Sequence, residues 1–323
     1  MSILEIRNLT TELMTDRGPI KAVDNVSFSL EKGEILGLVG ESGCGKSMTS
    51  MSIMQLLSRK NARISGEILF DGKDLLSLSE KEITNIRGHH ISMIFQDVMT
   101  SLNPLMTVGK QIMEPLMVHL GMNSSEARAE AIRLLDAVGI PMPEKRVDEY
   151  PNSLSGGMRQ RVMIAIALSC KPQVLIADEP TTALDVTIQA QILELMKKIR
   201  KEFGTAIIMI SHDLGVISEM CDRAAIMYCG NIVEQGSIDQ IFDNPTHPYT
   251  KGLLKSIPSL ETTSQQLYSI PGTVPPLYNL PQGCKFADRC YAVCDTCRTA
   301  APTVFEVEDN HTVCCRGGVV DGE

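Results

Sequence analysis

Gly40-Glu41-Ser42-Gly43-Cys44-Gly45-Lys46-Ser47 is the stretch of this sequence that decides its fold. It fits the pattern Gly-x4-Gly-Lys-Ser/Thr and follows a short apolar strand predicted at Ile35–Val39. Glycines let backbone N–H groups converge on phosphate oxygens, and the N-terminus of the helix that follows adds a favourable dipole. The stretch therefore predicts a phosphate-binding loop. The expected nucleotide contacts are Gly40, Ser42, Gly43, Cys44, Gly45, Lys46, Ser47 and Met48.

Two side chains of this loop have specific expected roles. Lys46 would neutralise the β- and γ-phosphates, and the Ser47 hydroxyl would bind Mg²⁺. Cys44 fills a variable position of the motif and has two interpretations. It is either a redox-sensitive thiol, whose pKa falls near the helix N-terminus, or a tolerated small side chain.

Strands and helices alternate along much of the chain. An apolar helical pattern covers Ile188–Phe203, and residues 97–160 are rich in helical pattern without strand signals. This alternation indicates a parallel α/β sheet. Further strands are predicted at Ile3–Ile6, Val26–Leu30, Ile68–Phe70, Ile91–Phe95, Val174–Ala177, Ala206–Ile210 and Ala224–Tyr228.

The composition excludes several classes of protein. The 323 residues are 43% hydrophobic, enough for a sizeable core, and the net charge of −9 does not attract nucleic acid. The longest apolar runs, such as 162–170, are about half the roughly 18 residues that cross a bilayer, and the N-terminus lacks a signal-peptide pattern. We expect a soluble intracellular protein that reaches a membrane only through a partner.

A second chemical motif is the apolar strand that ends at Asp178 and Glu179. Asp178 would hold Mg²⁺ through water, as in other phosphate-loop proteins. Glu179 would then polarise the attacking water. The alternative is an ordinary strand that ends in surface acids.

The third motif is Leu154-Ser155-Gly156-Gly157-Met158, a Ser-Gly-Gly turn that opens a predicted helix. The Ser155 hydroxyl and the two glycine amides would form an anion site at the helix N-terminus. The stretch resembles the signature motif of the ATP-binding cassette (ABC) family, and the resemblance covers residues 1 to about 255. It implies a P-loop NTPase (RecA-like) core with an antiparallel β subdomain, an inserted helical subdomain and a cysteine-rich C-terminal extension.

The resemblance also implies domain limits and a mechanism. Residues 1–96 and 161–255 would form the catalytic core with its β subdomain, 97–160 the helical signature subdomain and 256–323 the extension. In this family two cassettes pack head to tail, and each ATP lies between the phosphate loop of one chain and the signature of the other. ATP would close the dimer, water would attack in line, and the dimer would reopen.

Site residues carried over from the family fall in the expected order. Gln96 resembles the glutamine that senses Mg²⁺ and the attacking water, so Ser47, Gln96 and Asp178 form the implied magnesium set. Ala183-Leu184-Asp185 resembles the loop that meets the other cassette. His212 resembles the switch histidine that contacts the γ-phosphate, and with Glu179 it would orient the water. The nucleotide contacts would thus include Ser155, Gly156, Gly157, Asp178 and Asp185.

The adenine contact departs from the family pattern. These ATPases commonly stack adenine on an aromatic residue near positions 11 to 17, and this chain has none before Phe28. The base would instead lie on Leu13, Met14 or Arg17.

Three stretches narrow the resemblance to the dipeptide, oligopeptide and nickel importers: residues 96–104, 245–250 and 271–290. Met158 is typical of the D-type subunit, which pairs with a distinct F-type cassette. This implies an ATPase that powers peptide import, with two permease subunits, an extracytoplasmic solute-binding protein acting indirectly, no nucleic acid, and a peripheral place on the cytoplasmic face of the membrane. Nickel or another small solute is the alternative cargo. A cassette acting on nucleic acid, or another phosphate-loop class such as a kinase or GTPase, is the alternative protein.

Segment 97–110 carries apolar residues at the expected boundary with the membrane partner. Met99 and Leu102 are interpreted either as a docking surface or as core. For Leu105, Met106 and Val108 we expect core packing.

Ten cysteines are present, and six crowd the last forty residues, after a linker at 271–281. Cys284, Cys290, Cys297 and Cys315 match the cysteine pattern of the family's extension, which holds a [4Fe–4S] cluster in some relatives. Four thiolates suit that cluster or Zn²⁺, and unmetallated thiols are the third interpretation. Cys294 and Cys314 are extra to the pattern, so the choice of ligands among the six stays open, and Cys294-x2-Cys297 is itself a good metal-binding spacing.

Overall fold

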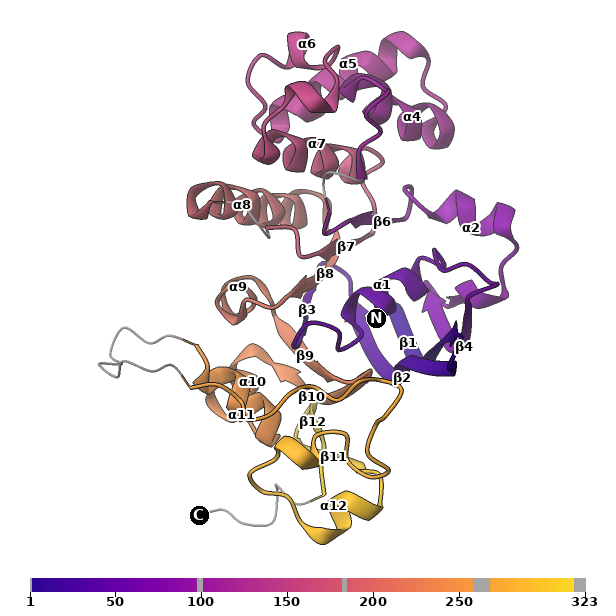
Figure 1. Ribbon diagram of the computed structural model, residues 1–323. Coiled ribbons are helices and arrows are strands. Elements are labelled where there is room, and N and C mark those ends of the chain that lie inside the picture. The colour runs from indigo at the N-terminus through magenta and orange to yellow at the C-terminus, as the bar shows by residue number, and fades with distance from the viewer. Residues whose placement is uncertain (1, 98–100, 182–184, 258–267, 317–323) are drawn as a thin grey trace. The chain divides into compact units, whose positions relative to one another are not determined.

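The computed structural model describes residues 2–97, 101–181, 185–257 and 268–316, which fall into two compact units. The first unit consists of Met1–Leu4, Leu30–Glu34 and Phe70–Ile210. The second consists of Glu5–Ser29, Ile35–Leu69 and Ser211–Glu323. The chain therefore crosses between the units several times, and each unit is built from segments distant in sequence (Figure 1).

The first unit contains a parallel ladder of β8 (Ala206–Ser211), β7 (Val174–Asp178) and β6 (Ile91–Ile94). Val174 lies opposite Ala206 on one side of β7 and opposite Ile91 on the other. Every residue of the three strands is buried, as expected for strands covered on both faces. All three predicted strands are confirmed, although β6 ends one residue earlier than expected.

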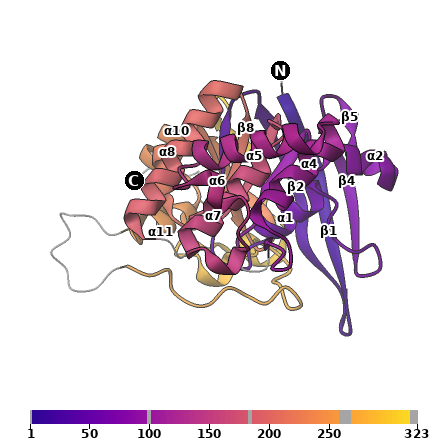
Figure 2. The same cartoon turned by 90° about the horizontal axis from the view of Figure 1, so that it is seen from above.

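In the first unit, α7 packs against α4 and α5 (Figures 1 and 2). α4 buries Val108, Ile112 and Leu116, one stripe at a spacing of four residues, and it begins at the Thr107 cap. Residues 101–160 contain no strand, which agrees with the prediction. Besides the three strands above, this unit contains the short strand β5 (Lys73–Asp74). Its helices are η1 (Leu75–Ser77), α2 (Glu80–Ile86), α4 (Val108–Leu120), α5 (Ser124–Ala137), α6 (Pro143–Arg146), η2 (Pro151–Ser153), α7 (Gly156–Leu168) and α8 (Val186–Phe203).

The second unit contains a long hairpin of β1 (Ser2–Thr15) and β2 (Gly18–Glu31), in a sheet of order β2-β1-β4 with β4 (Ala62–Phe70). The predicted strands in this region lie inside these longer ones. The helices described in this unit are α1 (Lys46–Ile53), α9 (Leu214–Met220), α10 (Ile238–Asp243), α11 (Pro248–Lys255), η3 (Ala287–Arg289) and α12 (Asp295–Thr299).

A second ladder in this unit joins the phosphate-loop strand to the C-terminal region. β3 (Ile35–Val39) runs parallel to β9 (Arg223–Tyr228), and β9 pairs antiparallel with β10 (Asn231–Ser237). β10 then pairs antiparallel with β12 (His311–Cys314), and β12 with β11 (Val304–Glu308). β10, β11 and β12 had no predicted counterpart. Through them the extension becomes part of the same sheet as β3.

Segment 97–110 gives a mixed result for the expected core residues. Leu102 and Val108 are buried, whereas Met99 lies outside the described residues. Leu105 is 85% exposed, so the expectation that it packs in the core is wrong. It lies in the loop before α4, where the described part of the chain leaves its side chain uncovered.

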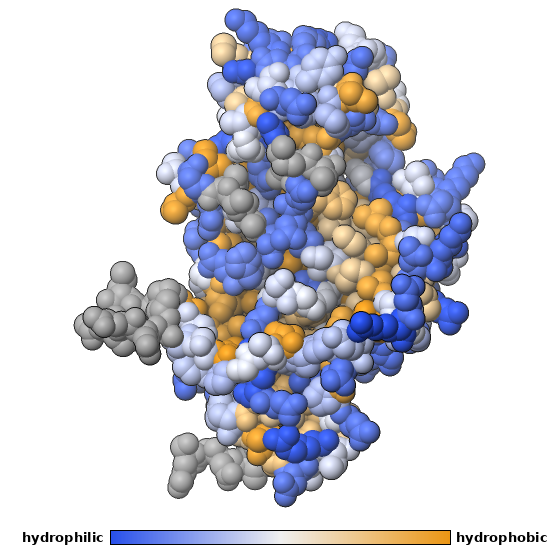
Figure 3. Space-filling view, in the orientation of Figure 1, coloured by the Kyte–Doolittle hydropathy of each residue, from blue (hydrophilic) through white to orange (hydrophobic). Residues whose placement is uncertain are grey.

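The surface over α4–α7 is largely hydrophilic, with isolated hydrophobic side chains (Figure 3). Across the described ranges, no helix combines the length and the apolar composition that a bilayer span requires.

Candidate functional site

The phosphate loop follows β3, whose five residues are all buried. Gly40 and Gly45 have φ values of 154° and 107°. A Cβ atom at Gly40 would lie 2.2 Å from the Met227 carbonyl oxygen, and one at Gly45 would lie 2.6 Å from the Ala22 carbonyl oxygen. The loop therefore needs glycine at both positions, for backbone conformation and for space.

Lys46 opens α1 and lies inside the curve of this loop. Its Nζ donates to the carbonyl oxygens of Gly40 at 2.6 Å and Glu41 at 3.2 Å, and the residue is only 6% exposed. The flanking Ser42 and Gly43 are exposed. An ammonium group held at this point suits the oxygens of a bound triphosphate.

The structure distinguishes between the two interpretations of Cys44. Its side chain is 1% exposed, and burial raises the pKa of the thiol above its ordinary value despite the nearby Lys46. The neutral thiol is favoured, so Cys44 behaves as a small buried side chain and not as an activated thiolate.

The carboxylate pair lies at the end of β7 in the first unit. Asp178 is 3% exposed, and Glu179 follows with φ of 48°, a left-handed conformation that costs a non-glycine residue about 1–3 kcal/mol. The Glu179 N–H donates to the Ile210 carbonyl at 2.9 Å, which fixes the turn.

Gln96 contacts this carboxylate. β6 and β7 are parallel neighbours, so their carboxyl ends meet at one edge of the sheet. Gln96 lies two residues beyond β6, and its Nε2 donates to Glu179 Oε2 at 2.9 Å. The structure thus brings together the predicted water-sensing amide and the predicted catalytic carboxylate.

The signature turn precedes α7. Ser155 caps the helix by accepting from the Met158 N–H at 3.4 Å, while Leu154 anchors the turn in the core. Arg159 Nε donates to the carbonyl oxygens of Pro151 at 2.9 Å and Leu154 at 3.0 Å. Ser155 and Gly156 remain exposed, as an anion site for another chain requires.

The start of α8 lies beside this turn. Asp185 caps α8 by accepting from the Ile188 N–H at 2.9 Å, and a Cβ atom on Gly157 would lie 3.4 Å from Ile188. Asp185 and the 83%-exposed Val186 therefore share a surface with the signature. Ala183 and Leu184 of the same predicted loop lie outside the described residues.

His212 belongs to the second unit, together with the phosphate loop, and directly follows β8. Its side chain is exposed, and the next residue, Asp213, caps α9 through the N–H groups of Gly215 and Val216. Gln96, Asp178 and Glu179 belong to the first unit.

The candidates for the adenine contact lie at the β1–β2 hairpin. Leu13 and Met14 are half-buried, and Arg17 is exposed at the turn. The Arg17 guanidinium lies 5.3 Å from the centre of the Tyr278 ring, an exposed aromatic residue of the C-terminal region. Sequence reasoning missed Tyr278, because it considered only aromatic residues upstream of the loop.

The cysteines of the extension influence one another electrostatically. Burial, together with the neighbouring Cys284, Cys315 and Cys297 thiols, raises the pKa of Cys290 to about 11. The four predicted ligands therefore gather in one region, and thiolate donors fit a soft metal centre. Within the residues that the structure describes, no three His, Cys, Asp or Glu side chains already have the arrangement of a metal site.

Cys294 has a different environment from these four thiols. Its Sγ lies 3.0 Å from that of Cys297, and hydrogen bonds from Thr296 and Cys297 lower the pKa of Cys294 to about 7. The extra cysteine identified in the sequence is thus an exposed, easily ionised thiol beside a predicted ligand.

The fold and the phosphate loop define a nucleotide-binding cassette ATPase. The family model described as "ABC transporter" matches residues 23–182, and "Oligopeptide/dipeptide transporter, C-terminal region" matches 233–297. A solved dimeric bacterial ABC transporter cassette, MJ0796, superposes with a TM-score of 0.66 at 30% identity, over 73% of this chain and 98% of that one.

Two curated relatives narrow the class. The oligopeptide transport ATP-binding protein AppD of Bacillus subtilis is 52% identical, over 97% of this chain and 96% of the relative. The oligopeptide transport ATP-binding protein OppD of Salmonella typhimurium is 50% identical, over 93% of this chain and 89% of the relative. The chain belongs to the ABC ATP-binding subunits of the dipeptide, oligopeptide and nickel importer family, in its D-type branch.

Proposed function

We propose that this protein is the ATP-hydrolysing subunit that powers import of di- and oligopeptides through a membrane ABC transporter. The likeness to peptide-transport ATP-binding proteins over nearly the whole of both chains carries this proposal. The match of residues 233–297 to the peptide-transporter C-terminal region supports it, because that region lies outside residues 23–182, which the general ABC transporter model matches. A nickel or other small-solute importer of the same family is the second candidate for cargo.

Uptake by the reconstituted transporter tests the cargo. The complete complex in proteoliposomes, with its solute-binding protein, should accumulate a labelled di- or oligopeptide only when Mg-ATP is supplied on the side of this subunit. ATP-dependent accumulation of nickel without peptide uptake would favour the second candidate. Identification of the ligand of the solute-binding protein by mass spectrometry would name the peptide.

In this proposal the phosphate loop binds ATP through its N–H groups, and Lys46 neutralises the terminal phosphates. Glu179, held by Gln96, accepts a proton from the attacking water, and His212 contacts the γ-phosphate. Hydroxyl, carboxylate and amide oxygens suit Mg²⁺, so Ser47, Asp178 and Gln96 would hold it. The ion supplies charge neutralisation on the phosphate oxygens.

The proposed assembly places the exposed signature surface against a second cassette. Ser155, Gly156 and Gly157 would bind the γ-phosphate held by an F-type partner, and Asp185 would contact that partner beside them. Two permease subunits would complete the complex at the cytoplasmic face of the membrane. We propose residues 1–96 and 161–255 as catalytic core, 97–160 as helical subdomain and 256–323 as extension.

Leu105 is the proposed contact with a permease. It is 85% exposed in the segment that follows Gln96, and burial of a leucine contributes about 1.5–3 kcal/mol to an interface. Leu105→Asp is expected to reduce co-purification of the permease subunits at least tenfold, while ATP binding by the isolated subunit stays unchanged. Val118→Asp, which changes another exposed residue (68%) on α4, is the matched control. Equal recovery of permease with both variants and the unaltered chain would contradict the assignment.

We further propose that Cys284, Cys290, Cys297 and Cys315 hold a [4Fe–4S] cluster, with Zn²⁺ as the alternative. Anaerobically purified protein should be brown, contain iron and sulfide, and lose its visible absorption in Cys290→Ser but not in Cys170→Ser, which changes a buried cysteine between α7 and β7. Colourless protein with one zinc per chain would exclude the iron–sulfur cluster.

A further inference from the structure

Arg289 of the C-terminal extension forms an ion pair with Glu41 of the phosphate loop. Arg289 Nη1 and Nη2 donate to the two Glu41 carboxylate oxygens at 2.7 and 3.0 Å, and both residues belong to the second unit. Glu41 is the second residue of the loop motif. The Arg289 side chain is 5% exposed and the Glu41 side chain 30%, so this paired geometry is largely shielded from water.

Several contacts fix Arg289 independently of Glu41. Its Nε donates to the Pro271 carbonyl at 3.0 Å, and its Nη1 also contacts the Tyr228 hydroxyl at 3.4 Å. The guanidinium carbon lies 5.8 Å from the centre of the Tyr228 ring and 5.9 Å from that of Phe286. These contacts hold the planar guanidinium group of Arg289 in one orientation.

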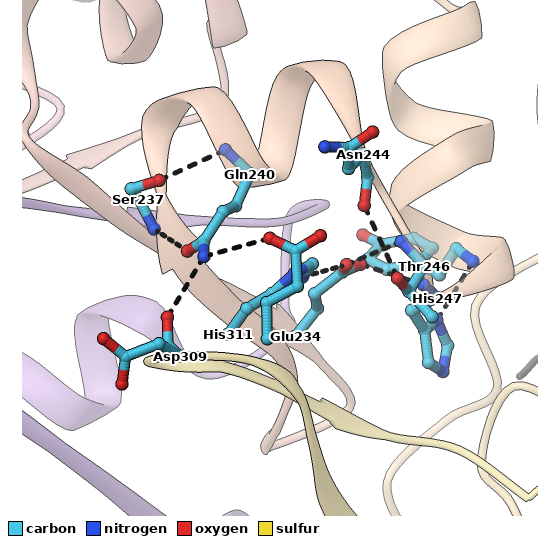
Figure 4. A network of polar contacts seen from close by, with 10 residues as sticks. Glu234, Ser237, Gln240, Asn244, Thr246, His247, Asp309 and His311 are labelled. Atoms are coloured by element: carbon cyan, nitrogen blue, oxygen red, sulfur yellow. Dashed lines mark hydrogen bonds and ion pairs between the residues drawn. The ribbon is translucent and has the colours of Figure 1, made fainter.

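The backbone of Glu41 is fixed as well. Its N–H donates to the hydroxyl of the fully buried Tyr249 at 3.0 Å. Tyr249 lies in the first turn of α11, where its own N–H donates to His247 Nδ1 at 3.0 Å. The Glu234 carboxylate accepts from the His247 N–H at 3.0 Å and lies 2.8 Å from His311 Nε2 on β12 (Figure 4).

These contacts bear directly on the phosphate-binding geometry. The Glu41 carbonyl accepts from Lys46 Nζ, so the position of Glu41 helps to set the position of the loop lysine. The Glu41 carboxylate is also a negative charge within the loop that must receive the phosphates. Arg289 compensates that charge, which would otherwise repel the triphosphate.

We propose that Arg289 is a positioning residue for the phosphate loop: through Glu41 it holds the loop in its ATP-binding shape and neutralises the one acidic side chain of the motif. The C-terminal extension thereby sets the affinity of the cassette for ATP. This inference rests on the proposed function of the loop as the ATP site. It assigns the extension a role in ATP binding.

Equilibrium binding of Mg-ATP to the full-length chain tests the proposal, measured in the Glu179→Gln background to prevent hydrolysis. Arg289→Ala is expected to weaken binding about tenfold, whereas Arg289→Lys, which keeps the charge, should lose less. Arg289→Ala combined with Glu41→Gln should bind better than Arg289→Ala alone, because the uncompensated carboxylate is gone. In the assembled transporter, Arg289→Ala should raise KM for ATP and change kcat little.

Arg298→Ala is the matched control, since this arginine of the same extension forms an exposed ion pair with Asp288. Its ATP affinity should equal that of the parent chain. Equal affinity in Arg289→Ala, or additive effects in the double variant, would overturn the proposal. If Arg289→Ala does not fold, Arg289→Lys and Glu41→Gln carry the test: unchanged affinity in both overturns it. Failure of the parent chain to bind ATP would instead overturn the proposed function.

Discussion

Glu179→Gln should lower ATP hydrolysis by about 10²- to 10⁴-fold while leaving Mg-ATP binding intact. The amide oxygen of the new side chain can still accept the hydrogen bond from Gln96, so the geometry at the end of β7 is preserved. The amide cannot take a proton from water. Phosphate release by the reconstituted transporter measures the rate, and size-exclusion chromatography with ATP should show cassette dimers trapped in the ATP-bound state.

Glu194→Gln is the control for this experiment, because Glu194 lies exposed on α8 and forms a surface ion pair with Lys197. It should hydrolyse ATP at the parent rate. A Glu179→Gln transporter with an unchanged rate would remove Glu179 from the proposed mechanism and direct attention to another base.

Lys46→Ala is expected to weaken Mg-ATP binding by roughly 10- to 150-fold, since hydrogen bonds to charged groups contribute about 1.5–3 kcal/mol. The ammonium lies within the loop, and no other cation is part of the motif. Calorimetric titration with Mg-ATP measures the loss. Lys60→Ala, an exposed lysine of the same unit, should bind as the parent does. Parent-like affinity in a folded Lys46→Ala variant would contradict the phosphate-loop assignment.

The local sequence was sufficient to predict the phosphate loop and the strand before it. The predicted strand Ile35–Val39 coincides with β3, because a short apolar run bounded by glycines has few alternatives. The meeting of Gln96 and Glu179 was also foreseeable, since both follow strands of the parallel sheet. The family resemblance identified both residues, and the parallel pairing of β6 with β7 brings the carboxyl ends of these strands together.

The sequence patterns did not predict the contacts between residues far apart in the chain. β10 carries Glu234 at its centre, a residue that argues against a buried strand, and its partner His311 lies 77 residues away. The Arg289–Glu41 pair spans 248 residues and leaves no periodic signal. Leu105 was misassigned for a related reason: hydrophobicity alone does not distinguish a core residue from one in an uncovered loop.

The pairing of β12 with β10 has a consequence for the solubility of the cassette. Without the extension, β10 would present the unpaired N–H and C=O groups of an open sheet edge, a template for association with other chains. β12 pairs with that edge at Glu234 and Gln235, and the new outer strand β11 carries the exposed acids Glu306 and Glu308, whose charge opposes further strand addition. The extension therefore covers part of a sheet edge that β10 would otherwise expose.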